Sequence, residues 1–159
     1  MEVDLNQHKD HAAVKIHPPV LLLIHMLGVY LLNRFLPLPF TFPNILKCAG
    51  YALVFLGIGL AFSAASRFMQ AHTTLDPHGS VSTIVTNGIY HFTRNPIYLG
   101  FVCMLIGFPF IFESYWGLIM SPVFILLMNL LVIQHEEAYL EKKFGETYTS
   151  YKSRVRRWL

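Results

Sequence analysis

Long apolar blocks dominate this chain of 159 residues. They run over residues 18–36, 45–68, 97–112 and 115–134. A helix that crosses the ~30 Å hydrocarbon layer needs ~20 apolar residues, because each residue adds ~1.5 Å. One such block could form a buried core helix, but four leave too little polar sequence to cover a soluble core. We therefore predict an all-α, polytopic membrane protein with about four transmembrane helices, folded as a single domain over residues 1–159.

The distribution of charge supports this prediction and suggests an orientation. Charged residues make up 13% of the chain, about half of the ~25% that is typical of soluble domains. With four crossings, one face holds both termini and the central loop, and it carries ten Lys and Arg residues against Arg34 and Lys47 on the other face. Because cytoplasmic loops are rich in Lys and Arg, we expect both termini on the cytoplasmic side, in a bacterial inner membrane.

The N-terminal residues argue against a cleaved secretory signal. Glu2, Asp4 and Asp10 precede the first apolar block, where a signal peptide would carry positive charge. We expect this block to be retained as a helix.

Several ligand classes are disfavoured. Cys48 and Cys103 lie in separate apolar blocks without paired spacing, and the histidines form no HExxH pattern, so no disulfide or metal site is predicted. The net charge of +3 gathers in the C-terminal tail, which favours the anionic surface of a lipid bilayer over nucleic acid as a partner.

The central polar stretch, residues 70–96, ends at a predicted helix N-terminus. Asp76-Pro77 and Asn87-Gly88 are turn signals, and Pro96 suits the first turn of the third helix. Between the turns, residues 82–86 are predicted to form a short extended piece or a brief surface segment. The unpaired N–H groups near Arg94 and Asn95 suit an anionic ligand. Local pattern alone favours a simpler role, in which Arg94 reaches lipid phosphate and Asn95 caps the helix.

The C-terminal polar stretch, residues 135–159, opens with two acidic residues at the end of the fourth apolar block. Glu136 and Glu137 oppose the helix dipole there, which is unexpected unless they hold a cation or a donor-rich ligand; an ordinary polar helix end is the alternative. Gly145 is predicted to end this helix, and Tyr148 and Tyr151 to share one face of the next. The final residues, Arg156, Arg157 and Trp158, suit an anionic membrane surface.

Taken together, these segments resemble a known family. Residues 94–100, Arg-Asn-Pro-Ile-Tyr-Leu-Gly, are similar to the Arg-His-Pro-x-Tyr-x-Gly signature of isoprenylcysteine carboxyl methyltransferases and their bacterial relatives. Residues 85–90 match the lead-in of that signature, and the order of Glu, Phe-Gly, Tyr and Arg residues after residue 135 follows the family's C-terminal pattern. The resemblance covers a little over half of the chain.

The resemblance implies a methyltransferase that uses S-adenosylmethionine and a hydrophobic or lipid acceptor. Its cofactor pocket would form from residues 72–100 and 135–157, without a Rossmann domain. The implied cofactor-binding residues are Gly88, Tyr90, Arg94, Asn95, Pro96, Tyr98, Gly100, His135, Glu136 and Glu137. Arg154 would hold a carboxylate acceptor, whereas an amine or thiol acceptor would need Glu137 or Tyr148 as a base.

Two departures and two alternatives stay open. Asn95 stands where the eukaryotic signature has histidine, and the chain is shorter than some relatives, so a prenylated substrate does not follow from the pattern. Membrane sterol reductases that use NADPH are similar at their C-terminal ends. A non-enzymatic, lipid-binding membrane protein is the other alternative, although polar residues at a membrane boundary argue against it.

Overall fold

The computed structural model describes residues 11–38, 41–74 and 79–159. The elements are α1 (Pro18–Phe35), α2 (Asn44–Gln70), η1 (Gly88–His91), α3 (Pro96–Phe112), α4 (Tyr115–Met128), η2 (Asn129–Ile133), α5 (Gln134–Phe144) and α6 (Glu146–Arg154). In the described part of the chain every regular element is helical, which confirms the all-α prediction. The predictions for Glu2, Asp4, Asp10 and Asp76-Pro77 lie outside the described residues.

Apolar surface surrounds the long helices. Among the described residues, three helices are long and apolar enough to cross a membrane: α1, α2, and the continuous helix Tyr115–Phe144 formed by α4, η2 and α5. Phe55 and Phe62 on α2 are 72% and 76% exposed, as expected for side chains that face lipid. The protein is therefore integral to a membrane. With 17 residues α3 is apolar but shorter, so a count of four crossings stays a prediction.

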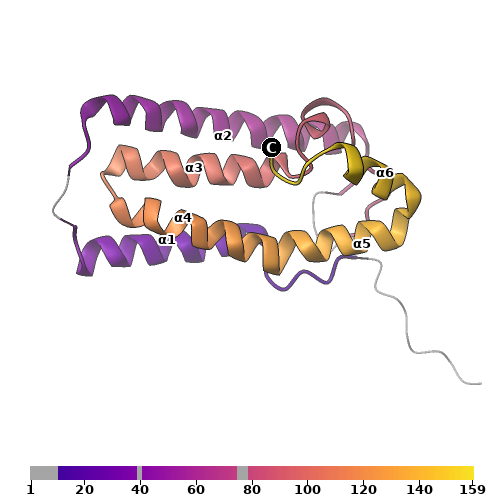
Figure 1. Ribbon diagram of the computed structural model, residues 1–159, viewed down its shortest axis with the longest axis horizontal. Coiled ribbons are helices and arrows are strands. Elements are labelled where there is room, and N and C mark those ends of the chain that lie inside the picture. The colour runs from indigo at the N-terminus through magenta and orange to yellow at the C-terminus, as the bar shows by residue number, and fades with distance from the viewer. Residues whose placement is uncertain (1–10, 39–40, 75–78) are drawn as a thin grey trace, which may run out of the picture.

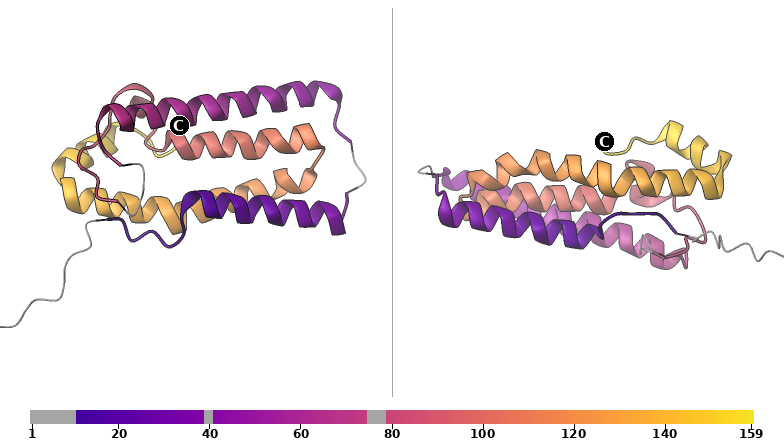
Figure 2. Two further views of the ribbon diagram at one scale, coloured as in Figure 1. Left: turned by 180° about the vertical axis from the view of Figure 1, so that it is seen from behind. Right: turned by 90° about the horizontal axis from the view of Figure 1, so that it is seen from below.

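The long helices lie side by side in an elongated bundle (Figure 1). In all views α3 runs along α2, the start of α4 lies beside α1, and α5 and α6 extend beyond the bundle at one end (Figure 2). A tight turn joins α3 to α4 at Glu113-Ser114. Glu113 adopts the left-handed conformation, and the Ser114 hydroxyl accepts a hydrogen bond from the N–H of Gly117. The helix α5, which contains Glu136 and Glu137, lies at the end of the bundle opposite to this turn (Figure 1).

Glycines bring α2 and α3 into backbone contact. A Cβ atom added at Gly57 would lie 2.5 Å from the carbonyl oxygen of Gly100, and one added at Gly107 would lie 2.7 Å from that of Gly50. Small residues allow close helix approach in membranes. Gly100, one of the implied cofactor-binding residues, makes room for the backbone of α2.

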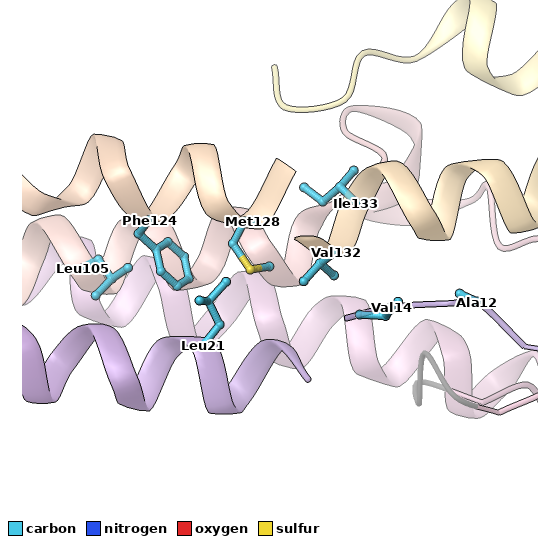
Figure 3. Packing of buried hydrophobic residues seen from close by; sticks show 8 residues of the cluster. All are labelled: Ala12, Val14, Leu21, Leu105, Phe124, Met128, Val132 and Ile133. Carbon is cyan, nitrogen blue, oxygen red and sulfur yellow. The ribbon is translucent and has the colours of Figure 1, made fainter. Parts of the chain in front are cut away.

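A buried apolar cluster joins α1, α3 and α4 to the N-terminal segment (Figure 3). Its members are Ala12, Val14, Leu21, Leu105, Phe124, Met128, Val132 and Ile133. The N–H of Lys15 donates to the carbonyl of Leu131 at 3.2 Å, so the N-terminal segment also bonds to η2. The cluster holds α4 and η2 in place, and α5, which contains Glu136 and Glu137, continues directly from η2.

The turn η2 is a π-helix within this long helix. The N–H of Gln134 donates to the carbonyl of Asn129, five residues earlier. Such π-bulges are frequent at functional sites. Here the helix continues directly into α5, which ends before Gly145 as the sequence predicts.

Candidate active site

A polar cavity of about 130 Å³ lies where the end of α2, residues 81–85, the start of α3, α5 and α6 meet. The predicted site residues that line it are Tyr90, Arg94, Asn95, Pro96, Tyr98, Glu136, Glu137 and Tyr148. Two stretches more than 30 residues apart in the sequence therefore converge on one cavity. The segment that was predicted to be an extended piece or a brief surface segment, residues 82–86, contributes three lining residues, of which Val85 is buried.

Glu137 is the electrostatic centre of this site. It is only 5% exposed, and its carboxylate lies 3.2 Å from Nη2 of Arg94. Arg157 donates to both carboxylate oxygens, at 3.0 Å from Nε and 2.7 Å from Nη2. Lys152 lies farther away, at 3.8 Å. A buried carboxylate is tolerated only when it is paired and hydrogen bonded, and these contacts meet that condition.

The C-terminal segment, residues 155–159, bonds to the start of α3. The N–H of Arg94 donates to the carbonyl of Arg156 at 3.0 Å. The carbonyl of Arg157 accepts from the Thr93 hydroxyl at 3.1 Å and from the Asn95 amide at 2.9 Å. Asn95 therefore does not cap its own helix through its side chain; it holds the C-terminal segment against the site.

Arg157 and Trp158, which were predicted to anchor the tail at a membrane surface, make contacts within the protein. Arg157 points to Glu137, and its hydrogen bonds to that carboxylate raise the pKa of its guanidinium. Trp158 packs against the apolar cluster of Figure 3. Alternation in an extended segment could have shown this, since Val155 is buried, Arg156 is exposed and Arg157 turns inward again.

Arg94 retains donors that no protein group uses. Its side chain is 9% exposed, and Nη2 faces Glu137. Among the described residues, Nε and Nη1 are buried and have no hydrogen-bond partner. Unpaired buried donors are costly, so this guanidinium is suited to an anionic ligand group inside the cavity.

Glu136 has a separate role from its neighbour. Its carboxylate accepts a hydrogen bond from the hydroxyl of Tyr98 at 2.6 Å, and it lies among the lining residues of the cavity. The charged groups that hold Glu137 form no ion pair with Glu136 in the described part of the chain. Glu136 is therefore the carboxylate better placed to bind a ligand.

Tyrosines form another part of the cavity wall. Burial, with a smaller contribution from Glu137, raises the pKa of Tyr148, and burial raises that of Tyr151 to about 12. Both phenols keep their protons near neutral pH. Tyr148 can therefore donate a hydrogen bond or present its ring, but it is poorly suited to the predicted role of a base.

Four predicted residues do not line the cavity. Gly88 has a φ of +61°, and a Cβ atom there would lie 2.5 Å from Nε of Arg67. Gly100 faces α2, and His135 lies elsewhere on α5, with a buried Nδ1 atom that has no hydrogen-bond partner in the described part of the chain. Arg154 is exposed and donates to the carbonyl of Ser150 on its own helix.

The position of Arg154 follows from helical geometry. The buried face of α6 and the residue after it consists of Tyr148, Tyr151 and Val155, at spacings of three and four. Arg154 lies about 100° from Val155 around the helix axis, since ~3.6 residues make one turn. Its side chain therefore points away from the cavity, and the arginine that reaches the site is Arg157.

Replacing Tyr151 with phenylalanine is expected to loosen the contact between α6 and η1. The Tyr151 hydroxyl donates to the carbonyl of Tyr90 at 2.6 Å in a buried setting, and its removal leaves that carbonyl unpaired. We expect a loss of about 1 kcal/mol, which lowers Tm by ~2–4 °C in detergent. The matched control is Tyr51→Phe on the lipid-facing surface of α2. Equal Tm values for the two variants would contradict this role.

The fold and the cavity thus define the class: a helical membrane protein with a polar cavity at one end of its helices. Residues 45–147 match the phospholipid methyltransferase family, and the chain belongs to this family. This match covers α2, α3, α4 and α5 with the loops between them. It confirms the family resemblance that the sequence motifs indicated.

Two relatives are similar over parts of the chain. An uncharacterized protein of Haemophilus influenzae is 57% identical over 37 residues, which are 23% of this chain and 59% of that protein. Protein-S-isoprenylcysteine O-methyltransferase of Schizosaccharomyces pombe is 28% identical over 109 residues, which are 65% of this chain and 46% of that protein. The matched region thus spans less than two thirds of either relative. No solved structure matches the chain.

Proposed function

We propose that this protein is a methyltransferase that uses S-adenosylmethionine to methylate a hydrophobic acceptor from the membrane. One observation carries the proposal: the family match over residues 45–147 includes the cavity walls that contain Arg94, Glu136 and Glu137. The excess of Lys and Arg on this side of the bundle supports a cytoplasmic position for the cavity.

The residues present suit the chemical groups of this cofactor. The open donors of Arg94 suit its carboxylate. Glu136 suits its ammonium group or its ribose hydroxyls, because a carboxylate accepts hydrogen bonds from both. The rings of Tyr90 and Tyr148 in the cavity wall suit a cationic sulfur, which aromatic faces attract.

Binding requires the cavity to widen. At about 130 Å³ it is smaller than the ~300–1,000 Å³ of ordinary small-molecule sites. The C-terminal segment does not line the cavity, but backbone and side-chain hydrogen bonds hold it to Thr93, Arg94 and Asn95 beside it. An outward shift of this segment would release Arg94 and Asn95, which line the cavity, and would let the cavity widen without separating the membrane helices.

The arrangement of acids and bases favours a carboxylate acceptor. The cofactor supplies a methyl group already activated by its sulfonium, so the protein mainly needs to position the acceptor in line. An amine or thiol would also need a base. Arg94 and Arg157 already bind the oxygens of Glu137, and Tyr148 keeps its proton, so the predicted bases are poorly suited to that task. A carboxylate needs none.

The first test is calorimetric binding of S-adenosylhomocysteine to the detergent-purified protein. We expect micromolar binding by the wild type and binding at least tenfold weaker in Arg94→Ala and Glu136→Gln, because hydrogen bonds to charged groups contribute ~1.5–3 kcal/mol. Glu141→Gln is the matched control, since Glu141 lies on the same helix but outside the cavity and pairs with Lys152.

Two results would contradict the proposal. One is the absence of S-adenosylhomocysteine binding by a well-folded wild type, above all if NADPH binds instead, which would favour the reductase alternative. The other is an equal loss of affinity in Glu141→Gln, which would show that the effect of Glu136→Gln is not local to the cavity.

A further inference from the structure

A second cavity lies at the other end of the bundle, within the apolar helices. It has a volume of about 520 Å³ and lies between α1, α3 and the start of α4. Its walls include Met26 and Val29 from α1 and Phe108 and Phe112 from α3. The volume falls in the ~300–1,000 Å³ range of ligand sites. It shares no lining residue with the polar cavity at the opposite end.

A buried histidine in this cavity lacks a hydrogen-bond partner. His25 is 8% exposed, and its Nε2 atom is buried and unpaired among the described residues. The edge-to-face contact with Phe124, at 5.2 Å between ring centroids, holds the imidazole in place. An unpaired polar group is costly in the apolar interior of a membrane, because no water is present to satisfy it. The side chain of His25 lines the cavity, so an occupant that displaces the neighbouring side chains can reach this atom.

Two other polar residues of the cavity bond to each other, and Tyr30 lies at the rim, where it is 63% exposed. The amide of Asn33 donates to the hydroxyl of Ser114 at 2.6 Å, which joins the end of α1 to the α3–α4 hairpin. None of the described lining residues is Asp, Glu, Lys or Arg. A charged headgroup would find no partner in this cavity, so its occupant carries a neutral polar group.

The rim of the cavity faces the bilayer. Met26, Tyr30 and Phe112 line it and are also exposed on the outer surface of the helices. In a membrane these side chains contact lipid, so an occupant enters from the bilayer and brings an apolar chain with it.

We propose that this cavity binds a long-chain alcohol of the membrane, with its hydroxyl group hydrogen bonded to Nε2 of His25. A hydroxyl both donates and accepts, so it pairs with Nε2 in either tautomer of the neutral imidazole. The apolar chain fills the space between α1 and α3. This site is separate from the proposed methyl-transfer site and does not depend on it.

The test uses the full-length protein in phosphatidylcholine nanodiscs and a long-chain alcohol that carries a photoactivatable diazirine. Labelled peptides are identified by mass spectrometry, and unlabelled hexadecanol and hexadecane are compared as competitors. We expect labelling of α1 and α3 that hexadecanol suppresses and hexadecane does not.

Three variants test the residues that carry the proposal. His25→Phe keeps an aromatic ring but removes Nε2, and it should weaken hexadecanol competition about 3- to 10-fold, as expected for one hydrogen bond. Val29→Phe fills the cavity and should abolish labelling. Leu23→Phe adds similar bulk on the exposed side of α1, outside the cavity, and should change nothing.

Thermal unfolding of each variant in the same nanodiscs separates lost binding from lost folding. Equal competition by hexadecanol and hexadecane in the wild type would overturn the proposal, since the cavity would then accept any bilayer chain. Undiminished hexadecanol competition in a folded His25→Phe variant would overturn it equally.

Discussion

Replacing Glu137 with alanine is expected to release the C-terminal segment and to destabilise the protein by about 3–5 kcal/mol, because breaking a buried ion pair leaves uncompensated charge. Arg94 would lose its carboxylate partner while it stays buried. Arg157 would lose both of its hydrogen bonds to the carboxylate. Thermal unfolding in detergent measures the loss. Limited trypsin digestion measures the release, since the freed backbone around Arg154 and Arg156 can enter the active site of the protease.

Glu141→Ala is the control for this variant. Glu141 lies one helical turn further along α5 and pairs with Lys152 on the partly exposed surface, where ion pairs contribute only ~0–1 kcal/mol. It should leave Tm and the digestion pattern nearly unchanged. If Glu137→Ala were cleaved at the wild-type rate, Glu137 would not be what holds the C-terminal segment in place.

Replacing Gly57 with alanine is expected to have the second large effect. The added Cβ atom would lie 2.5 Å from the carbonyl oxygen of Gly100, which belongs to a helix backbone and cannot rotate away. The two helices must separate, at a cost of about 1–3 kcal/mol. Because α3 begins at Pro96, the separation also displaces Arg94 and Tyr98, so S-adenosylhomocysteine binding should weaken together with Tm.

Gly59→Ala provides a sharp control for this second variant. A Cβ atom at Gly59 meets no other atom within 4 Å, and alanine favours a helix over glycine by ~1 kcal/mol. We therefore expect opposite signs: a lower Tm for Gly57→Ala and an unchanged or higher Tm for Gly59→Ala. Equal destabilisation by both would mean that the glycine contacts between α2 and α3 do not determine stability.

The helices themselves follow closely from the apolar blocks. Runs of apolar residues bounded by Pro, Gly and charged residues predicted α1, α2 and α3 to within about two residues at each end. The fourth block was different, because polar residues of α5 prolong the same helix beyond the apolar stretch. An apolar run predicts which part of a helix contacts lipid, but it does not predict the residue at which the helix ends.

The site was predicted well where sequence motifs name residues and poorly where tertiary packing decides. Motif similarity named eight of the nineteen residues that line the cavity, and Arg94, Glu136 and Glu137 are among them. It did not show that Gly100 serves the contact with α2, because the pairing of helices is not encoded in a local pattern. It also favoured Arg154 over Arg157, since the turn from α6 into an extended segment changes which side chains point inward.

The π-turn η2 has a geometric consequence for the long helix. Each residue of an α-helix advances the side-chain direction by ~100°, and closing a hydrogen bond over five residues accommodates one extra residue. The lipid-facing stripe of α4 and the ligand-facing stripe of α5 are thereby out of phase along one unbroken rod. The bulge therefore determines the direction in which Glu136 and Glu137 point around the helix axis. As a result, the face of α4 that contacts lipid does not determine which face of α5 lines the cavity.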